Sequence, residues 1–169
     1  MPALRITLDI AAEPGVLFAL TQDYSQRLCW DPFLREARLL NGATAPDRGV
    51  RAWCVARSGL GMETEYVSWQ PPRVAAVKMT RGPWFLASFA GSWRFETLPA
   101  GGTRVSFAYW LSAHPRWLRW LLDPILQGMF ARDTARRLRA LKRAAATTDL
   151  ISYYSHARRS RHADRFPLD

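Results

Sequence analysis

Hydrophobic and polar residues alternate in seven short segments of the chain, and this pattern predicts seven β-strands. In the first segment, residues 5–11, Ile6, Leu8 and Ile10 fall on one face. The others are predicted at residues 35–41, 50–58, 62–70, 74–80, 86–98 and 103–112. Short turn-forming stretches separate the last five segments, and connections this short indicate an antiparallel meander.

A second periodicity, with apolar residues at steps of three or four, predicts helices. Two short helices are expected at residues 12–23 and 24–34, the second broken by Pro32. A long helix is expected from Asp123, as N-cap, with Pro124 at its first position. Its apolar face comprises Leu126, Phe130, Thr134, Leu138, Leu141 and Ala145, and its opposite face carries Arg132, Arg136, Arg139 and Arg143.

This order of elements predicts an α+β fold with one domain over residues 1–146 and a basic tail over residues 147–169. A sheet of this length must bury one face, and the long helix is the only predicted element that can cover it. A curved antiparallel sheet wrapped around that helix would enclose a cavity between the two, and such a cavity is the default binding site.

Composition adds a strongly basic C-terminal third. The formal net charge is +10, and residues 113–169 carry 12 basic and 5 acidic side chains. An anionic partner such as phosphate, RNA or a lipid headgroup is one interpretation, and a solvated helix face is the other. No window is apolar enough to span a membrane, the N-terminal residues lack a secretory pattern, and Cys29 and Cys54 are expected to be reduced core thiols, so we expect a cytoplasmic protein.

Several strings in a fixed order resemble the START-like helix-grip superfamily, also called SRPBCC, and within it the polyketide cyclase/dehydrase-like group. They are "AAEPGVLFALTQD", "WDPF", "VSWQPPRVAAVKM", "GSWRFETLPAGGTRVSFAYWL" and a closing helix with "RRLRALKRAA". The resemblance covers roughly residues 4–145. It implies two short helices after the first strand and a hydrophobic cavity for lipids, polyketides, hormones or quinones. Its members include cyclases, carriers and ribosome-associated proteins, so the resemblance implies no single activity.

Strand alternation selects residues that would face this cavity. Phe89, Gly91, Trp93 and Phe95 share one face of their strand, opposite Arg94. Val105, Phe107, Tyr109 and Leu111 share a face of the next. In residues 62–70, Glu63 and Glu65 indicate a wet face opposite Thr64, Tyr66 and Ser68, although Val67 and Trp69 contradict a clean split. The predicted ligand-binding residues are Trp30, Phe33, Cys54, Tyr66, Met79, Phe89, Trp93, Phe107, Tyr109, Trp117, Leu126 and Phe130.

Candidate catalytic groups are few. Tyr66, Tyr109 and Arg94 could polarise a carbonyl or accept a proton in a cyclase reaction, and an ordinary packing or surface role is the alternative for each. Cys54 is expected to line the cavity rather than act as a nucleophile. No metal-ligand spacing and no phosphate-binding loop is present, so no cofactor is predicted.

Three functions remain open from the sequence. The first is binding of a small hydrophobic molecule in the cavity, with cyclase or aromatase activity as an extension. The second is a regulatory role on RNA or the ribosome through the basic C-terminal third, that is, Arg132, Arg136, Arg139 and Arg143 together with the tail. The third is membrane contact through residues 114–130, although we expect Trp117 and Trp120 to cover one end of the sheet or the cavity mouth, with Pro124 as a hinge. The oligomeric state is not predicted.

Overall fold

The computed structural model describes residues 4–147. Within that range the strands are β1 (Leu4–Ile10), β2 (Leu34–Leu39), β3 (Arg51–Ala56), β4 (Gly61–Gln70), β5 (Val74–Arg81), β6 (Leu86–Thr97) and β7 (Thr103–Ala113). The helices are α1 (Pro14–Gln22), α2 (Arg27–Trp30) and α3 (Arg119–Ala145), with a short 3-10 helix, η1 (Arg116–Leu118), before α3. The strand and short-helix predictions are therefore confirmed to within a few residues. The predicted tail lies outside the described residues from residue 148 onward.

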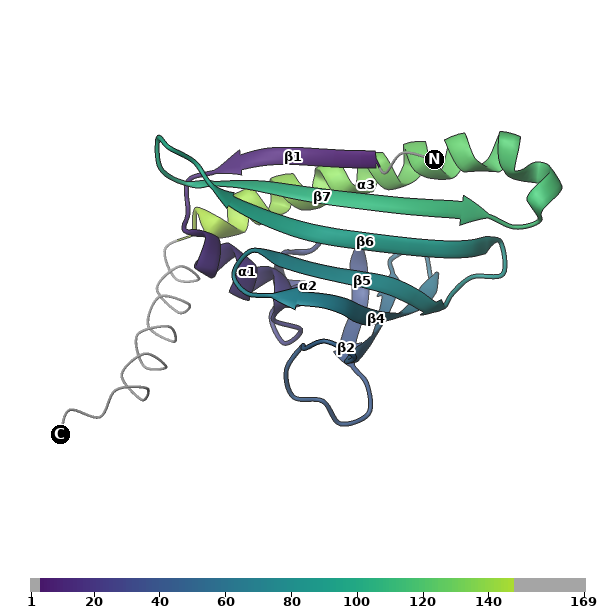
Figure 1. Cartoon of the computed structure of the whole chain (residues 1–169), viewed down its shortest axis with the longest axis horizontal. Helices are drawn as coiled ribbons and strands as arrows, with labels where there is room; N and C mark the ends of the chain where they lie inside the picture. The colour runs from purple at the N-terminus through teal and green to yellow at the C-terminus, as the bar shows by residue number, and fades with distance from the viewer. Residues whose placement is uncertain (1–3, 148–169) are drawn as a thin grey trace.

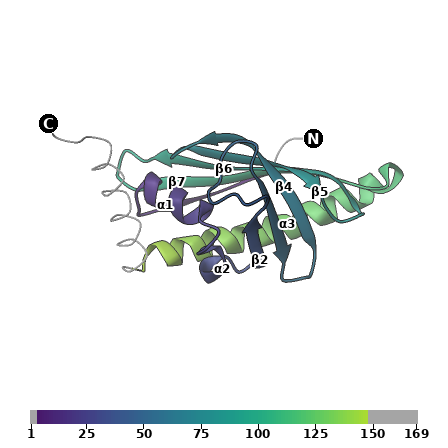
Figure 2. The same ribbon diagram turned by 90° about the horizontal axis from the view of Figure 1, so that it is seen from below.

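All strands join one antiparallel sheet in the order β1-β7-β6-β5-β4-β3-β2. The run from β2 to β7 is a meander, as predicted, and β1 closes the sheet by pairing with β7, with Leu4 opposite Tyr109 and Ile10 opposite Thr103. The sheet curves, and α3 runs along one of its faces beneath β1 and β7 (Figure 1). Viewed from below, α1 and α2 lie on the same side as α3 (Figure 2). The predicted helix-grip architecture is confirmed.

The core lies between this concave face and the helices, and strand alternation fills it as predicted. On β6, Trp93 and Phe95 are buried while Arg94 is exposed, and on β7 Val105, Phe107, Tyr109 and Leu111 are all buried. Gly91 takes the place of a side chain between aromatic rings, because a Cβ there would lie 3.0 Å from the Phe107 ring. The glycine therefore leaves room for the rings on either side of it.

A bulge in β4 explains the conflicting pattern of residues 62–70. Tyr66 pairs with Val77 and Ser68 with Ala76, so Val67 is an extra residue in the ladder. The bulge shifts the alternation by one residue. As a result Trp69, rather than Ser68, contacts the core, with its ring 5.0 Å from that of Phe18 and 5.4 Å from that of Tyr66.

The start of α3 differs from the prediction. The helix begins at Arg119 and continues through Pro124, so Asp123 is not its N-cap and Pro124 is not a hinge between two pieces. Asp123 instead lies one turn inside the helix, is buried, and its Oδ1 accepts a hydrogen bond from the backbone N–H of Ala113 at 2.8 Å. Pro124 is the sixth residue of the helix, so its missing N–H removes only the bond that would go to the Trp120 carbonyl, and the helix continues past it.

Two further expectations were wrong. Cys29 is exposed on α2, so it is not a core thiol. Trp117 and Trp120 cover neither the sheet nor a cavity mouth, since 74% and 75% of their surfaces are exposed. Both side chains belong to the first turns beyond the end of β7, where the helix extends past the sheet.

The Asp123 carboxylate ties the start of α3 to the end of β7, so we expect Asp123→Ala to destabilise the fold. The variant leaves the buried N–H of Ala113 without an acceptor, which costs about 1–3 kcal/mol. Urea titrations of the unfolding free energy would measure this. Asp123→Asn keeps an acceptor oxygen and should lose clearly less, and equal stability of Asp123→Ala and the wild type would contradict the assignment.

Candidate functional site

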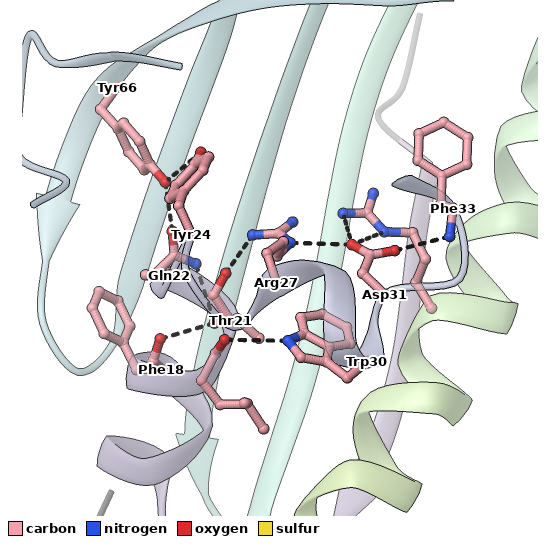
Figure 3. Close-up of polar contacts among 11 residues, drawn as sticks. Phe18, Thr21, Gln22, Tyr24, Arg27, Trp30, Asp31, Phe33 and Tyr66 are labelled. Atoms are coloured by element: carbon pink, nitrogen blue, oxygen red, sulfur yellow. Dashed lines mark hydrogen bonds and ion pairs between the residues drawn. The ribbon is translucent and has the colours of Figure 1, made fainter. Parts of the chain in front are cut away.

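A carboxylate shared by two arginines lies at the centre of the concave side of the protein. Asp31 directly follows α2, and its Oδ2 accepts hydrogen bonds from Arg27 Nε at 3.1 Å and from Arg137 Nε and Nη2 at 3.1 and 2.9 Å. The other oxygen accepts the backbone N–H of Phe33 at 3.1 Å. Arg27 also donates to the backbone carbonyl of Thr21 (Figure 3). We refer to these three side chains as the Arg27–Asp31–Arg137 cluster.

The cluster is buried, and its charges do not cancel. The side chain of Asp31 is 0% exposed, and those of Arg27 and Arg137 are 8% and 13% exposed. Burial acts to raise the pKa of Asp31, but the charges of Arg137 and Arg27 outweigh it and hold the pKa below its ordinary value of 3.8. One carboxylate faces two guanidinium groups, so the cluster keeps one positive charge in excess.

Aromatic rings surround both guanidinium groups. The Arg27 guanidinium carbon lies 5.4 Å from the Trp30 ring centre, and that of Arg137 lies 5.3 Å from Phe33 and 5.7 Å from Phe107. The Trp93 ring contacts both arginines, at 5.9 and 5.8 Å. These distances are within the range of cation–π attraction, so the rings partly replace the water that the cations lose.

A chain of hydrogen bonds runs beside the cluster to α1. The hydroxyl of Tyr66 donates to Gln22 Oε1 at 2.8 Å and lies 3.1 Å from the Tyr24 hydroxyl. Gln22 Nε2 donates to the hydroxyl of Thr21, which donates to the Phe18 carbonyl (Figure 3). Since the Tyr66 hydroxyl proton is used in the bond to Gln22, Tyr24 must donate to Tyr66. Every proton in the chain therefore points toward α1.

Both phenols of this hydrogen-bond chain have a raised pKa. Burial raises the pKa of Tyr24 to about 12 and raises the pKa of Tyr66 well above 10.0. Burial also raises the pKa of the Cys54 thiol, against the opposing charges of Arg27 and Arg137. At neutral pH all three groups are uncharged, so the thiol is a poor nucleophile and neither phenol acts as a base.

A second aromatic group continues the face toward the start of α3. The ring centre of Phe130 lies 5.7 Å from that of Phe89, 5.8 Å from that of Tyr109 and 6.5 Å from that of Phe33. The Tyr109 hydroxyl donates to the backbone carbonyl of Gln127 at 3.0 Å, and burial raises its pKa to about 12. Tyr109 thus binds sheet to helix, whereas Phe89 and Phe130 remain only half-buried.

A cleft of about 290 Å³ opens beside the cluster. Its walls come from the end of α2, the end of β3 and the middle of α3, and they are formed by Pro32, Phe33, Ala56, Arg57, Ser58, Asp133 and Arg136. Phe33 belongs to both features, because Arg137 lies over its ring. The cleft is at the lower end of the size range of small-molecule sites.

A larger depression, of about 530 Å³, shares no lining residue with this cleft and is lined by Thr7, Leu8, Asp9, Arg104 and Lys142. Asp9 and Arg104 pair there with each other at 2.9 Å, and both side chains are about half exposed. Paired, solvated charges of this kind offer little to an apolar ligand, so we place the candidate site at the cluster and its cleft.

The predicted site residues separate into three groups. Trp30, Phe33, Trp93 and Phe107 contact the cluster, and Tyr66 and Cys54 lie within its electrostatic reach. Phe89, Tyr109, Leu126, Phe130 and Met79 belong to the adjoining aromatic and aliphatic surface. Arg94 and Trp117 are exposed, and the structure does not bring either to the site.

Sequence reasoning missed the charged centre itself. Arg27 and Asp31 are four residues apart, which is the spacing of an ion pair on a helix. This spacing was the one sequence feature that could have predicted their contact. No feature of the sequence indicated that Arg137 is buried, because it lies beside Arg136 and Arg139 in a stretch that is typical of a solvated face. Only the folded arrangement shows that this arginine points inward.

The sequence matches the family model described as "Polyketide cyclase / dehydrase and lipid transport" over residues 1–146. The chain belongs to this family. A search of curated proteins gives no match for it. Among residues 4–147 of the chain, no helix is long and apolar enough to cross a membrane.

Solved structures confirm the fold of this family member. A START superfamily protein from Mycobacterium smegmatis is 11% identical, with a TM-score of 0.71 over 86% of this chain and 97% of the other. The Zhui aromatase/cyclase from Streptomyces sp. R1128 is 15% identical, with a TM-score of 0.65 over 85% and 92%. A protein from Thermus thermophilus reaches 20% identity and a TM-score of 0.69 over 86% and 100%.

Because Asp31 compensates two buried cations, we expect Asp31→Ala to destabilise this family member by about 3–5 kcal/mol. Denaturant unfolding near neutral pH would measure the loss. Asp47→Ala removes a carboxylate from an exposed loop and is the matched control. If the two variants were equally stable, the cluster would not hold charge in the folded state.

The stabilisation that Asp31 gives to the fold depends on pH. The folded-state pKa of Asp31 lies below 3.8, so its stabilisation is present above that pH and is lost as the pH falls through the folded-state pKa. The stability difference between wild type and Asp31→Ala should therefore shrink in acid. Unfolding titrations at a series of pH values test this, and a difference that is constant down to the acid transition would contradict it.

Proposed function

We propose that this protein binds a small, mostly apolar molecule that carries an anionic or carbonyl oxygen, with its apolar part on the aromatic face of the sheet and its oxygen at Arg137. The single observation that carries this proposal is the excess positive charge of the buried Arg27–Asp31–Arg137 cluster. Buried charges are costly to a fold, and a cation without a full counter-charge gains most from an anionic partner.

Arg137 is the group best suited to meet a ligand. It is the more exposed arginine of the cluster, and its ring neighbour Phe33 forms part of the cleft wall. Without Arg137, the remaining Arg27 and Asp31 would form a neutral pair. Since Arg137 is the arginine next to the cleft wall, its charge is the one that a ligand in the cleft would meet. Guanidinium groups also present several N–H donors in a plane that suits carboxylate and carbonyl oxygens.

The surrounding groups favour binding over proton transfer. The hydroxyl groups of Tyr24 and Tyr66 donate their protons within the hydrogen-bond chain that leads to α1. Asp31 forms ion pairs with both arginines. These neighbours offer shape, aromatic contact and positive charge, and no base poised near neutral pH. The site is thus suited to hold and orient a ligand.

Cyclisation of a poly-β-keto chain is a second candidate, supported by the family and by the aromatase/cyclase with the same fold. In an intramolecular aldol step, an α-carbon loses a proton and bonds to a carbonyl carbon, whose oxygen becomes a hydroxyl. Arg137 could stabilise the negative charge that develops on that oxygen. The aromatic face would hold the chain folded, so that the reacting carbons lie close together.

A role on RNA or the ribosome has less support. Arg132, Arg136, Arg139 and Arg143 are exposed, as predicted, but Arg136 faces Asp133 at 3.8 Å and Arg139 donates to the carbonyl of Ala135. None of the relatives described above is named for RNA binding. This alternative stays a prediction.

Two fluorescent naphthalene dyes of similar shape test the binding proposal. 1-anilinonaphthalene-8-sulfonate carries an anionic group, and N-phenyl-1-naphthylamine does not. We expect Arg137→Gln to weaken the sulfonate by about tenfold or more, because a hydrogen bond to a charged group is worth about 1.5–3 kcal/mol, and to leave the neutral dye within about twofold.

Arg139→Gln, which removes a neighbouring arginine from the solvent face of α3, is the matched control and should change neither affinity. A Trp117→Ala, Trp120→Ala variant tests for dye on the exposed surface. Equal weakening of both dyes by Arg137→Gln, or loss of the sulfonate in the tryptophan variant alone, would contradict the proposed site. Native mass spectrometry of the purified protein would identify a ligand that copurifies.

A further inference from the structure

Three tryptophans are exposed at one end of the molecule. Trp84 is 82% exposed in the β5–β6 turn, and Trp117 and Trp120 are 74% and 75% exposed at the start of α3. A hydrogen bond of 2.7 Å from the His114 N–H to the Phe85 carbonyl joins the two segments. The β5–β6 turn and the first turns of α3 therefore lie together beyond the end of β7, at the right of Figure 1.

The outer face of α3 extends this apolar surface. Leu121, Ile125 and Met129 follow one another at steps of four and are 43%, 52% and 57% exposed. Farther along the helix the exposed positions become Arg132, Arg136, Arg139 and Arg143. The solvent side of one helix thus changes from apolar to basic along its length. A helix face that contacts only water is normally polar. Large exposed apolar residues in the first turns of α3 therefore indicate contact with another surface.

Basic side chains also flank the exposed tryptophans. Arg81 precedes the β5–β6 turn, and Arg116 precedes Trp117; both are exposed. Among residues 4–147, neither forms an ion pair, and neither does Arg132. The two acidic residues of α3 are already engaged: Asp123 holds the Ala113 N–H and Asp133 faces Arg136. The surface therefore combines exposed indole rings with unneutralised positive charge.

We propose that this end of the protein docks on an anionic phospholipid membrane surface. Indole rings favour the boundary between headgroups and acyl chains, and arginines favour anionic headgroups. The docking surface comprises Trp84, Trp117, Trp120, Leu121, Ile125 and Met129.

The length of the apolar stretch suits this contact. Within α3, residues 121 to 129 rise roughly 12 Å along the helix axis at 1.5 Å per residue, and an interfacial helix lies along the membrane plane with its apolar face buried about 5–10 Å deep. The first turns of α3 can therefore enter the interface while Arg132 and Arg136 remain at the level of the headgroups. Phe130 belongs to the same half of α3, and its half-buried ring lies 5.7 Å from that of Phe89, so this aromatic surface is the part of the concave face nearest to the docking surface along the helix.

Vesicle flotation tests the proposal with the full chain. One set of vesicles is phosphatidylcholine alone, and the other contains phosphatidylserine as about a third of its lipid. We expect binding to the anionic vesicles that falls about tenfold or more in a Trp117→Ala, Trp120→Ala variant and in an Arg116→Glu, Arg132→Glu variant. All four side chains are exposed or at the surface, so the variants should fold, which circular dichroism would check.

Matched controls lie elsewhere on the surface. Leu28→Ala removes an exposed leucine from α2, and Arg73→Glu reverses an exposed charge in the β4–β5 turn, at the opposite end of the sheet. Both should bind anionic vesicles as the wild type does. Equal loss in these controls would overturn the assignment of the surface, because any apolar or basic change would then have the same effect.

Other occupants give other results. No binding to either vesicle, or equal binding to both, would overturn the proposal. A concentration-dependent dimer in sedimentation that the tryptophan variant abolishes, without vesicle binding, would assign this face to a second copy of the chain. Binding of single-stranded RNA but not of vesicles would assign it to nucleic acid. The dye titrations on Arg137 are independent of these outcomes, so either proposal can fail alone.

Discussion

A single carboxylate oxygen on Asp31 accepts hydrogen bonds from two guanidinium groups that are supplied by opposite parts of the chain. Arg27 comes from α2, near the N-terminus, and Arg137 comes from the C-terminal helix. The contact therefore joins α2 to α3 across the concave face of the sheet. Because each charge is removed from water, Asp31 stabilises both guanidinium groups, and the aromatic rings partly replace the water that the cations lose.

This contact decides which chemistry the concave face can support. The rings of Trp30, Phe33, Trp93 and Phe107 surround cations instead of forming a purely apolar core. The nearby phenols are neutral and bonded to each other and to α1, so they fix the shape of the site without exchanging protons. A ligand would meet positive charge on a rigid aromatic surface, which is an environment for orientation and for stabilising negative charge on oxygen.

The two halves of α3 make different contacts. Its second half seals the core through Thr134, Leu138, Leu141 and Ala145, all of which are buried. Its first half is held to β7 by three side-chain hydrogen bonds, which involve Arg119, Asp123 and Tyr109. Other residues of this half present apolar side chains to solvent. This division leaves the aromatic surface around Phe89 and Phe130 only half covered. The half-covered rings and the exposed tryptophans therefore lie toward the start of the helix, whereas Arg137 belongs to its second half.

Hydrophobic periodicity and turn residues were enough to predict the seven strands, the short helices and the amphipathic long helix, because both act locally. The sequence also identified the inward aromatic faces of β6 and β7. It misplaced the start of α3, because an aspartate before a proline is typical of a helix start and nothing local revealed that Asp123 bonds to β7. It could not foresee the bulge at Val67, which depends on the register with β5. The pairing of β1 with β7 and the approach of Arg137 to Asp31 depend on the folded arrangement, since each joins residues about a hundred positions apart. The local sequence carries no record of which distant charge a buried group will meet.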